Sequence, residues 1–191
     1  MGEKEGYTFI EGENIDLIPN NPDNVGLYAK WINDPKVRKY SRNAVPLTIE
    51  EMKKRWFEPR KPGEVRDSIA FEIWHKNDKK TIGIVGLSNI RWFDRWANSF
   101  IQIGEVHYWS QNIATEATQL LLKYAFDELD LNKLSAGIAV RNVGSWRVAE
   151  KAGFILEGMV KNEDYVDGEY VDVKFYYYSK EEWMKLKKKE C

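Results

Sequence analysis

The segment between Tyr108 and Phe154 constrains the fold more than any other part of this chain. It contains a tight polar turn, a long amphipathic helix, an alternating strand over 133–140 and a short capped helix. The long helix begins in the turn 111–115, and its first N–H groups have no partner within the helix. These groups and the helix dipole can hold a phosphate or pyrophosphate. A strand, a helix and a strand in this order also predict a right-handed parallel crossover.

Two residues of the turn suit an anion site. Asn112 tolerates a left-handed backbone better than most other non-glycine residues do. Ala114 is small enough to let a ligand approach the backbone closely. The residues Leu120, Leu121 and Tyr124 then recur at helical spacing, so we expect the helix to bury that face.

The rest of the chain alternates between helix and strand patterns. Thr48 and Glu51 form a capping box at the start of one helix, and Asn142 caps another. Apolar periodicity and turn residues predict helices at about 22–33, 48–57 and from 179 onward, and strands at 15–19, 68–74, 81–92, 100–103, 154–159 and 171–178. These elements predict an α+β fold, an α/β/α sandwich with one central mixed, mostly antiparallel sheet.

Length and composition narrow the class of protein. At 191 residues the chain fits a single domain spanning 1–191. The net charge of −1 argues against nucleic acid as a partner. Cys191 is the only cysteine, which excludes a disulfide within the chain, and no apolar run approaches the ~20 residues that cross a bilayer. We therefore expect a cytoplasmic protein with no membrane partner.

Three sequence segments carry a family resemblance. Residues 108–117 (YWSQNIATEA), 142–145 (NVGS) and 150–154 (EKAGF) resemble the acetyl-CoA-binding core of the GNAT acyltransferase superfamily. The match is nearest to the branch typified by ribosomal-protein N-terminal acetyltransferases, and weaker similarity at 31–37 and 165–172 extends it over nearly the whole chain. The resemblance implies an N-acetyltransferase that uses acetyl-CoA and releases coenzyme A.

The resemblance also implies where the cofactor binds. In the family a central strand splays from its parallel neighbour and binds the pantetheine arm, and a loop at a helix N-terminus binds the diphosphate. The loop pattern maps onto Trp109, Asn112 and Ala114, with Asn112 where the family usually has glycine. The cofactor-binding residues expected by resemblance are Ile101, Gln102, Ile103, Trp109, Gln111, Asn112, Ile113, Ala114, Thr115, Glu116, Asn142, Ser145 and Arg147.

Three residues are candidates for acid and base roles. By resemblance, Ser145 donates a proton to the departing thiolate, although a small polar residue is also common at the third position of a helix. Asp164 stands where relatives place a carboxylate that activates the amine, or is simply a residue of a solvated loop before Tyr165. Glu163 is its fallback. Glu105 follows the central strand and could act through a water, or be a surface residue at the rim of the cleft.

The acceptor is an amine of unknown identity. At pH 7 an α-amine with pKa near ~7.8 costs roughly 1 kcal/mol to hold neutral, and a lysine-like amine near ~10.4 costs roughly 4.6 kcal/mol. The resemblance favours a protein N-terminal α-amine, acetylated by direct transfer in a ternary complex. A small amine such as a polyamine, an amino sugar or an antibiotic is the alternative acceptor. A non-catalytic acyl-CoA-binding module is the alternative of another class.

The remaining expectations concern metals, assembly and aromatic residues. The sequence has no metal-ligand spacing, so we expect no metal. A monomer and a homodimer both remain open. Trp92, Trp96 and Trp109 are expected near the site or its rim, where Trp92 and Trp96 could form a dimer contact, a substrate lip or neither.

Overall fold

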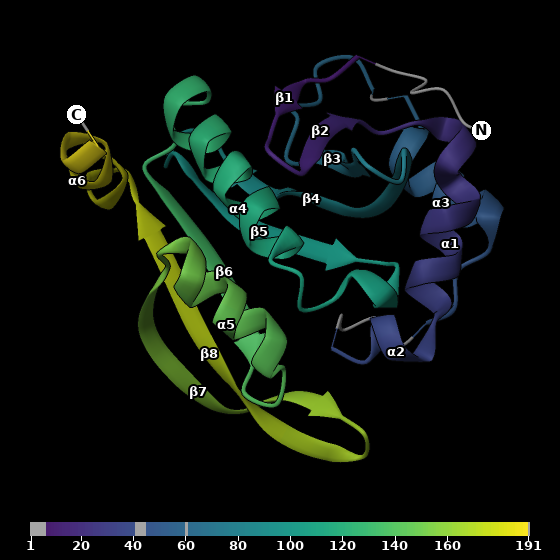
Figure 1. Ribbon diagram of the computed structural model, residues 1–191. Helices are drawn as coiled ribbons and strands as arrows, with labels where there is room; N and C mark the ends of the chain where they lie inside the picture. Colours follow the sequence, from purple (N-terminus) through teal and green to yellow (C-terminus); the bar gives the residue numbers. More distant parts are fainter. Residues whose placement is uncertain (1–6, 41–44, 60, 191) are drawn as a thin grey trace.

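A single eight-stranded sheet forms the framework of the molecule (Figure 1). The structure is a computed structural model that describes residues 7–40, 45–59 and 61–190. The strands lie in the order β1-β2-β3-β4-β5-β6-β8-β7. Their bounds are Ile10–Glu11 (β1), Ile15–Pro19 (β2), Ile69–His75 (β3), Lys80–Arg91 (β4), Trp96–Ile103 (β5), Lys133–Ala139 (β6), Ile155–Val166 (β7) and Glu169–Ser179 (β8). Among the strands of the described residues, only β5 and β6 pair in parallel, and the other neighbours are antiparallel.

The helices fall into separate groups along the sheet. In Figure 1, α4 and α5 lie side by side over one face, α1 and α3 gather beside the N-terminal strands, and α6 stands at the far end. The helical segments are η1 (Pro22–Asn24), α1 (Val25–Asn33), α2 (Pro35–Arg38), α3 (Ile49–Phe57), η2 (Val106–Tyr108), α4 (Ile113–Lys123), the π-helical η3 (Tyr124–Glu128), α5 (Val143–Ala152) and α6 (Lys180–Glu190). Within the described ranges, no helix combines the length and the apolar character needed to cross a membrane.

Two hydrophobic clusters lie on opposite faces of the sheet. Val85 belongs to the larger cluster, which is beneath α4 and α5, and its neighbour Ile84 belongs to the cluster beneath α1 and α3. Successive side chains of a strand point to opposite faces, so β4 supplies both cores. The two clusters give the three layers of an α/β/α sandwich, as predicted.

A buried carboxylate fixes α1 against the sheet. Glu72 in β3 is fully buried and accepts hydrogen bonds from Asn24 Nδ2 (2.8 Å), Thr81 Oγ1 (2.5 Å) and the Tyr28 hydroxyl. Burial raises the pKa of Tyr28, and its hydrogen bond to Glu72 raises it further. The phenol therefore stays neutral and donates to the carboxylate. This network sets the position from which α1 reaches the end of β5.

Most elements expected from the sequence are confirmed. The Thr48–Glu51 capping box is present at α3, Asn142 caps α5, and the crossover from β5 through α4 to β6 is parallel. Two short elements, β1 and α2, were not expected. The proline at 35 ends α1, but Asp34 then caps a new turn by accepting from the N–H of Lys36 at 2.8 Å.

The predicted loop around Asp164 is wrong. The strand expected at 154–159 continues to Val166, so Asp164 lies within β7, directly opposite Val171 of β8. Two bulges interrupt the alternation of β7, and a turn at Asp167 and Gly168, both with positive φ, closes the hairpin. Bulges remove the period-two pattern by which a strand is recognised, which is why the sequence suggested a loop.

Candidate active site

The sheet opens between its two parallel strands. β5 and β6 pair at three positions only, from Trp96 with Lys133 to Asn98 with Ser135. Beyond Asn98, β5 is paired on its β4 side alone, and β6 is paired on its β8 side alone. The predicted strand positions Ile101, Gln102 and Ile103 therefore border a splay, where unpaired backbone groups can bind an extended ligand as another strand would.

The turn before α4 has the backbone shape of an anion site. Asn112 is the N-cap of α4 in a left-handed conformation (φ 61°), and Ser110 also has positive φ (64°). Within the described part of the chain, the N–H groups of residues 111–115 donate to no protein acceptor, and Glu116 is the first whose N–H does, to Asn112 O at 3.0 Å. Ile113 is buried, so only its backbone N–H can face a ligand. The row of free N–H groups fits a diphosphate.

Short hydrogen-bonded links hold this turn in place. Trp109 Nε1 donates to the carbonyl of Ile103 at 2.9 Å, and Gln111 Nε2 donates to the carbonyl of His107 at 2.7 Å. From α5, Lys151 Nζ reaches Asn112 Oδ1 at 3.2 Å. Lys151 thus brings a cation to the N-terminus of α4, where an anionic ligand would need it.

A tyrosine anchors the segment that leads into the turn. The Tyr108 hydroxyl donates to Asp78 in the turn between β3 and β4. Burial, together with the neighbouring Asp78 carboxylate, raises the pKa of Tyr108 to about 12. The same hydrogen bond lowers the pKa of Asp78. The anchor therefore keeps one neutral donor and one ionised acceptor across the neutral pH range.

Glu116 is committed to protein contacts. Its Oε1 accepts from the N–H of Asn14 at 2.8 Å and of Ile15 at 3.3 Å, and its Oε2 accepts from Asn14 Nδ2 at 3.0 Å. The backbone N–H of Glu116 is also occupied, because it donates to Asn112 O. The Glu116 carboxylate therefore ties the turn before β2 to α4. Its predicted role in cofactor binding stays a prediction.

The start of α5 brings Asn142 and Ser145 together. Asn142 Oδ1 accepts from the N–H of Ser145 at 3.3 Å, which is the cap geometry expected from the sequence. Ser145 is half-buried, and its hydroxyl forms no hydrogen bond with the described residues. A hydroxyl without a protein partner can serve a ligand. Further along α5, Arg147 is exposed and lies over the Trp146 ring, 5.6 Å from its centre.

Glu105 is held by the first helix. Its Oε1 accepts from Lys30 Nζ at 2.7 Å and from Trp31 Nε1 at 2.9 Å. The hydrogen bond from Lys30 lowers the pKa of Glu105 most, and the hydrogen bond from Trp31 lowers it further. The adjoining position 104 accommodates only glycine, because a Cβ there would lie 2.0 Å from the Trp31 indole. The sequence did not predict that Lys30 and Trp31 bind Glu105, because no local pattern around them identifies a partner so far away in the chain.

The β7–β8 hairpin carries the third candidate. Asp164 is half-buried in β7, on the strand that leads to the hairpin turn. Tyr40 packs against the small cluster of Ala139, Val166 and Val171, and Lys39 pairs with Asp167 at 2.8 Å. The segment after α2 is thus fastened to the hairpin. Ser145 in α5, Glu105 in the connection between β5 and η2, and Asp164 in β7 come from three separate segments of the chain.

Two tryptophans lie away from the site. Trp96 is the first residue of β5, and its Nε1 donates to Ser135 Oγ at 2.9 Å. Ile103 is at the other end of that strand, roughly 23 Å away at about 3.3 Å per residue. Trp92 Nε1 donates to the carbonyl of Arg66 at 2.5 Å. The expectation that Trp92 and Trp96 lie near the site or its rim is wrong, because both lie at the paired end of β5 and β6.

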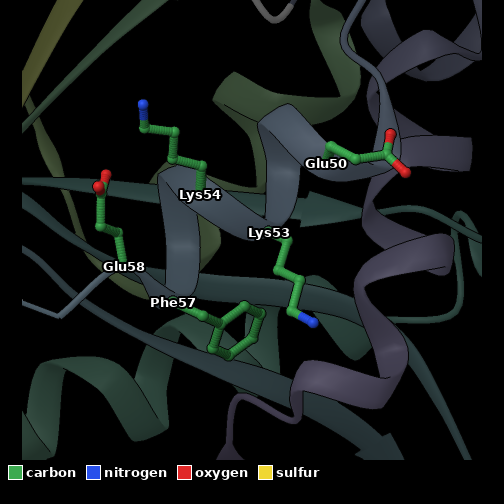
Figure 2. Close-up of a pocket in the computed structure, with 5 residues that line it drawn as sticks. All are labelled: Glu50, Lys53, Lys54, Phe57 and Glu58. Atoms are coloured by element: carbon green, nitrogen blue, oxygen red, sulfur yellow. The ribbon is translucent and has the colours of Figure 1, made fainter.

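An open hollow of about 370 Å³ lies over α3. Figure 2 shows its lining residues, which all come from this one segment: Glu50, Lys53, Lys54, Phe57 and Glu58. The charged side chains extend away from the helix, and none of the predicted site residues takes part. Among the described residues, no group of His, Cys, Asp or Glu could hold a metal ion.

Comparison with known proteins identifies the family. The pattern described as acetyltransferase (GNAT) domain matches residues 15–155. The chain belongs to the GNAT acetyltransferase family. It is 34% identical over 131 residues to "Probable N-acetyltransferase YjcK" of Bacillus subtilis, covering 65% of this chain and 69% of that protein. It is also 34% identical over 112 residues to "Putative ribosomal N-acetyltransferase YdaF" of the same organism, covering 56% of this chain and 57% of that protein.

Solved structures agree on the GNAT fold. Spermidine N-acetyltransferase from Vibrio cholerae, solved with CoA and spermine, superposes with a TM-score of 0.81 at 22% identity, covering 90% of this chain and 98% of the other. The family match and the relatives named as N-acetyltransferases make this chain an acetyl-CoA-dependent GNAT N-acetyltransferase. The splay, the free N–H groups of residues 111–115 and the Lys151 cation fit acetyl-CoA as its cosubstrate.

Proposed function

We propose that this GNAT enzyme acetylates the α-amine of a protein N-terminus. The observation that carries the proposal is the state of Glu105. Its ion pair with Lys30 lowers its pKa, so it is a weak base. An α-amine, whose neutral form costs roughly 1 kcal/mol at pH 7, needs little help from Glu105, whereas a lysine-like amine at roughly 4.6 kcal/mol needs more help than Glu105 in this state can add.

Two similar proteins with ribosomal substrates in their names support a protein as acceptor. YdaF is named a ribosomal N-acetyltransferase, and its match covers 57% of that protein. A ribosomal-protein-S5-alanine acetyltransferase from Vibrio fischeri shares the fold with a TM-score of 0.77 at 21% identity. We also propose that residues 1–191 form one catalytic domain, since the single sheet contains strands from Ile10 to Ser179.

Each candidate residue receives a role in direct transfer. Acetyl-CoA supplies the activated thioester, which the amine attacks in a ternary complex as the C–N bond forms and the C–S bond breaks. Residues 111–115 hold the diphosphate through their N–H groups, and Lys151 adds a positive charge. Asp164 accepts the proton of the amine, with Glu105 assisting through a water. Ser145 donates a proton to the departing thiolate.

A polyamine is the second candidate acceptor. The chain is 31% identical over 136 residues to the spermidine N(1)-acetyltransferase of Vibrio cholerae, covering 64% of this chain and 76% of that protein. A polycation would need unpaired carboxylates in the cleft. Lys30 neutralises Glu105 on one wall, which favours a peptide over a polyamine.

Thiol release from acetyl-CoA tests the proposal. Peptides with a free N-terminus are compared with the same peptides blocked at the N-terminus but carrying a free lysine, and with spermidine and amino sugars. We expect turnover only with free N-termini, and a decrease in kcat of about 10²-fold or more for Ser145→Ala and Asp164→Ala. Faster turnover of spermidine than of every peptide would overturn the acceptor. Full activity of both variants would overturn the roles.

A further inference from the structure

One long edge of the sheet presents apolar side chains to solvent. β7 is the last strand in the sheet order, and among the described residues no strand pairs with its outer edge (Figure 1). Four apolar residues near its start are substantially exposed: Ile155 by 39%, Leu156 by 50%, Met159 by 53% and Val160 by 44%. The opposite edge of the sheet is β1, which has two residues. Long apolar edges invite pairing with another strand, whereas very short edges avoid it.

The four side chains divide into two matched pairs. Directly opposite residues share a face of the sheet, as do residues an even number apart on one strand. On β8, Tyr177 lies opposite Ile155 and Val173 lies opposite Val160. Tyr176 lies opposite Leu156 and Lys174 lies opposite Met159. Ile155 and Val160 therefore share one face, and Leu156 and Met159 share the other. The bulge between Leu156 and Gly158 makes this possible, because it shifts the alternation by one residue.

We propose that a second copy of this chain binds antiparallel along β7. The two-fold axis passes between Glu157 and Gly158, so that Ile155 meets the partner's Val160, and Leu156 meets the partner's Met159. Both contacts join side chains on the same face, as antiparallel pairing requires. Each of these four apolar side chains is then covered by an apolar side chain of the partner, and the two-fold symmetry forms each contact twice.

Charge and space at the centre fit this register. Glu157 is the charged residue within the stretch 155–160, and Lys133 neutralises it at 2.5 Å. It would meet the partner's Gly158, where a Cβ would have no atom within 4 Å, so the carboxylate has room. The second bulge and the charged Lys161 and Glu163 follow Val160 immediately. Such features end a pairing edge, which confines the contact to 155–160 and favours one partner over open-ended aggregation.

Exchanging apolar pairs for charged pairs tests the register in the full-length chain. Light scattering after gel filtration should give twice the chain mass for the wild-type protein. Leu156→Lys and Met159→Glu should each be monomeric, with the dissociation constant raised more than about a hundredfold, because each places an unpaired charge in an apolar contact. Mixing the two variants should restore a dimer, and so should the double variant, since position 156 faces position 159 of the partner.

Met184→Glu on α6 is the matched control, because Met184 is 44% exposed and outside the stretch. It should remain dimeric. Acetyl-CoA binding and the thermal midpoint confirm that each variant is folded. A monomeric wild-type protein at about 100 μM, or a dimeric Met159→Glu variant, would overturn the proposal. Monomeric single variants that the mixture fails to rescue would overturn the register. These readouts do not depend on which amine the enzyme acetylates.

Discussion

The proposed cofactor side and the proposed acceptor side of the site are built in different ways. On the proposed cofactor side, several stabilising contacts join near neighbours in the chain, such as Gln111 with His107 four residues away and Asn142 with Ser145 three residues away. Lys151 and Asn14 add contacts to α4 from 39 and 102 residues away. On the acceptor side, Lys30 and Trp31 reach Glu105 across 75 and 74 residues. The turn before α4 can therefore be recognised from local sequence, whereas the proposed acceptor wall at Glu105 exists only once the chain has folded.

The largest effect is expected where the two sides join. Gly104→Ala places a Cβ 2.0 Å from the indole of Trp31, which is fully buried and cannot move aside. Overpacking of this kind should lower the free energy of unfolding by about 3 kcal/mol, measured by urea denaturation. Gly26→Ala in α1 is the matched control, because its Cβ would meet nothing within 4 Å. It should leave stability unchanged or raise it by about 0.5–1 kcal/mol. Equal midpoints for both variants would contradict the contact.

The cofactor side is tested at its left-handed residue. Asn112→Val forces a β-branched residue into positive φ, at about 1–2 kcal/mol. We expect acetyl-CoA to bind about 5–30-fold more weakly by calorimetry. Asn112→Gly also loses the hydrogen bond from Lys151 but allows the same backbone, so it should bind acetyl-CoA as tightly as the wild-type protein. If the two variants bind equally, the backbone conformation is not what matters.

The acceptor side is tested through the charge of Glu105. Lys30→Met removes the main cause of its lowered pKa, so that pKa should rise toward its ordinary value. A depressed carboxylate pKa stabilises the folded state above the unfolded pKa, and this contribution is lost as the pH falls through the folded pKa. Lys30→Met should therefore be less stable than the wild-type protein at pH 7, and the difference should shrink as the pH falls below about 4.3, the ordinary pKa of glutamate, and be lost below the folded pKa of Glu105. Lys53→Met on α3 should show no such pH dependence.

The smallest effect is expected at the hairpin. The Lys39–Asp167 pair is exposed, and exposed ion pairs contribute little. Lys39→Ala and Asp167→Ala should each change the acceptor KM by less than about fivefold, and the double variant should match either single variant. The KM for acetyl-CoA should stay constant. A large change in that KM would mean that the hairpin also shapes the cofactor side.

Local patterns in the sequence determined most of the fold and the turn that begins α4. The Thr48–Glu51 box, the Asn142 cap and the apolar spacing after Asn112 are short-range signals, and each lies where it was expected. Such signals work because caps, turns and periodicity depend on backbone groups within a few residues. The family resemblance came from the same region, where the cofactor turn is continuous in sequence.

Only the tertiary structure decided the rest. Lys30 meets Glu105 because the buried Glu72 network positions α1, and Asp164 belongs to a strand because β8 pairs with it through two bulges. Trp96, adjacent to the site in the sequence-based interpretation, lies at the opposite end of β5. These positions depend on contacts between residues far apart in the chain, whose partners no local pattern specifies.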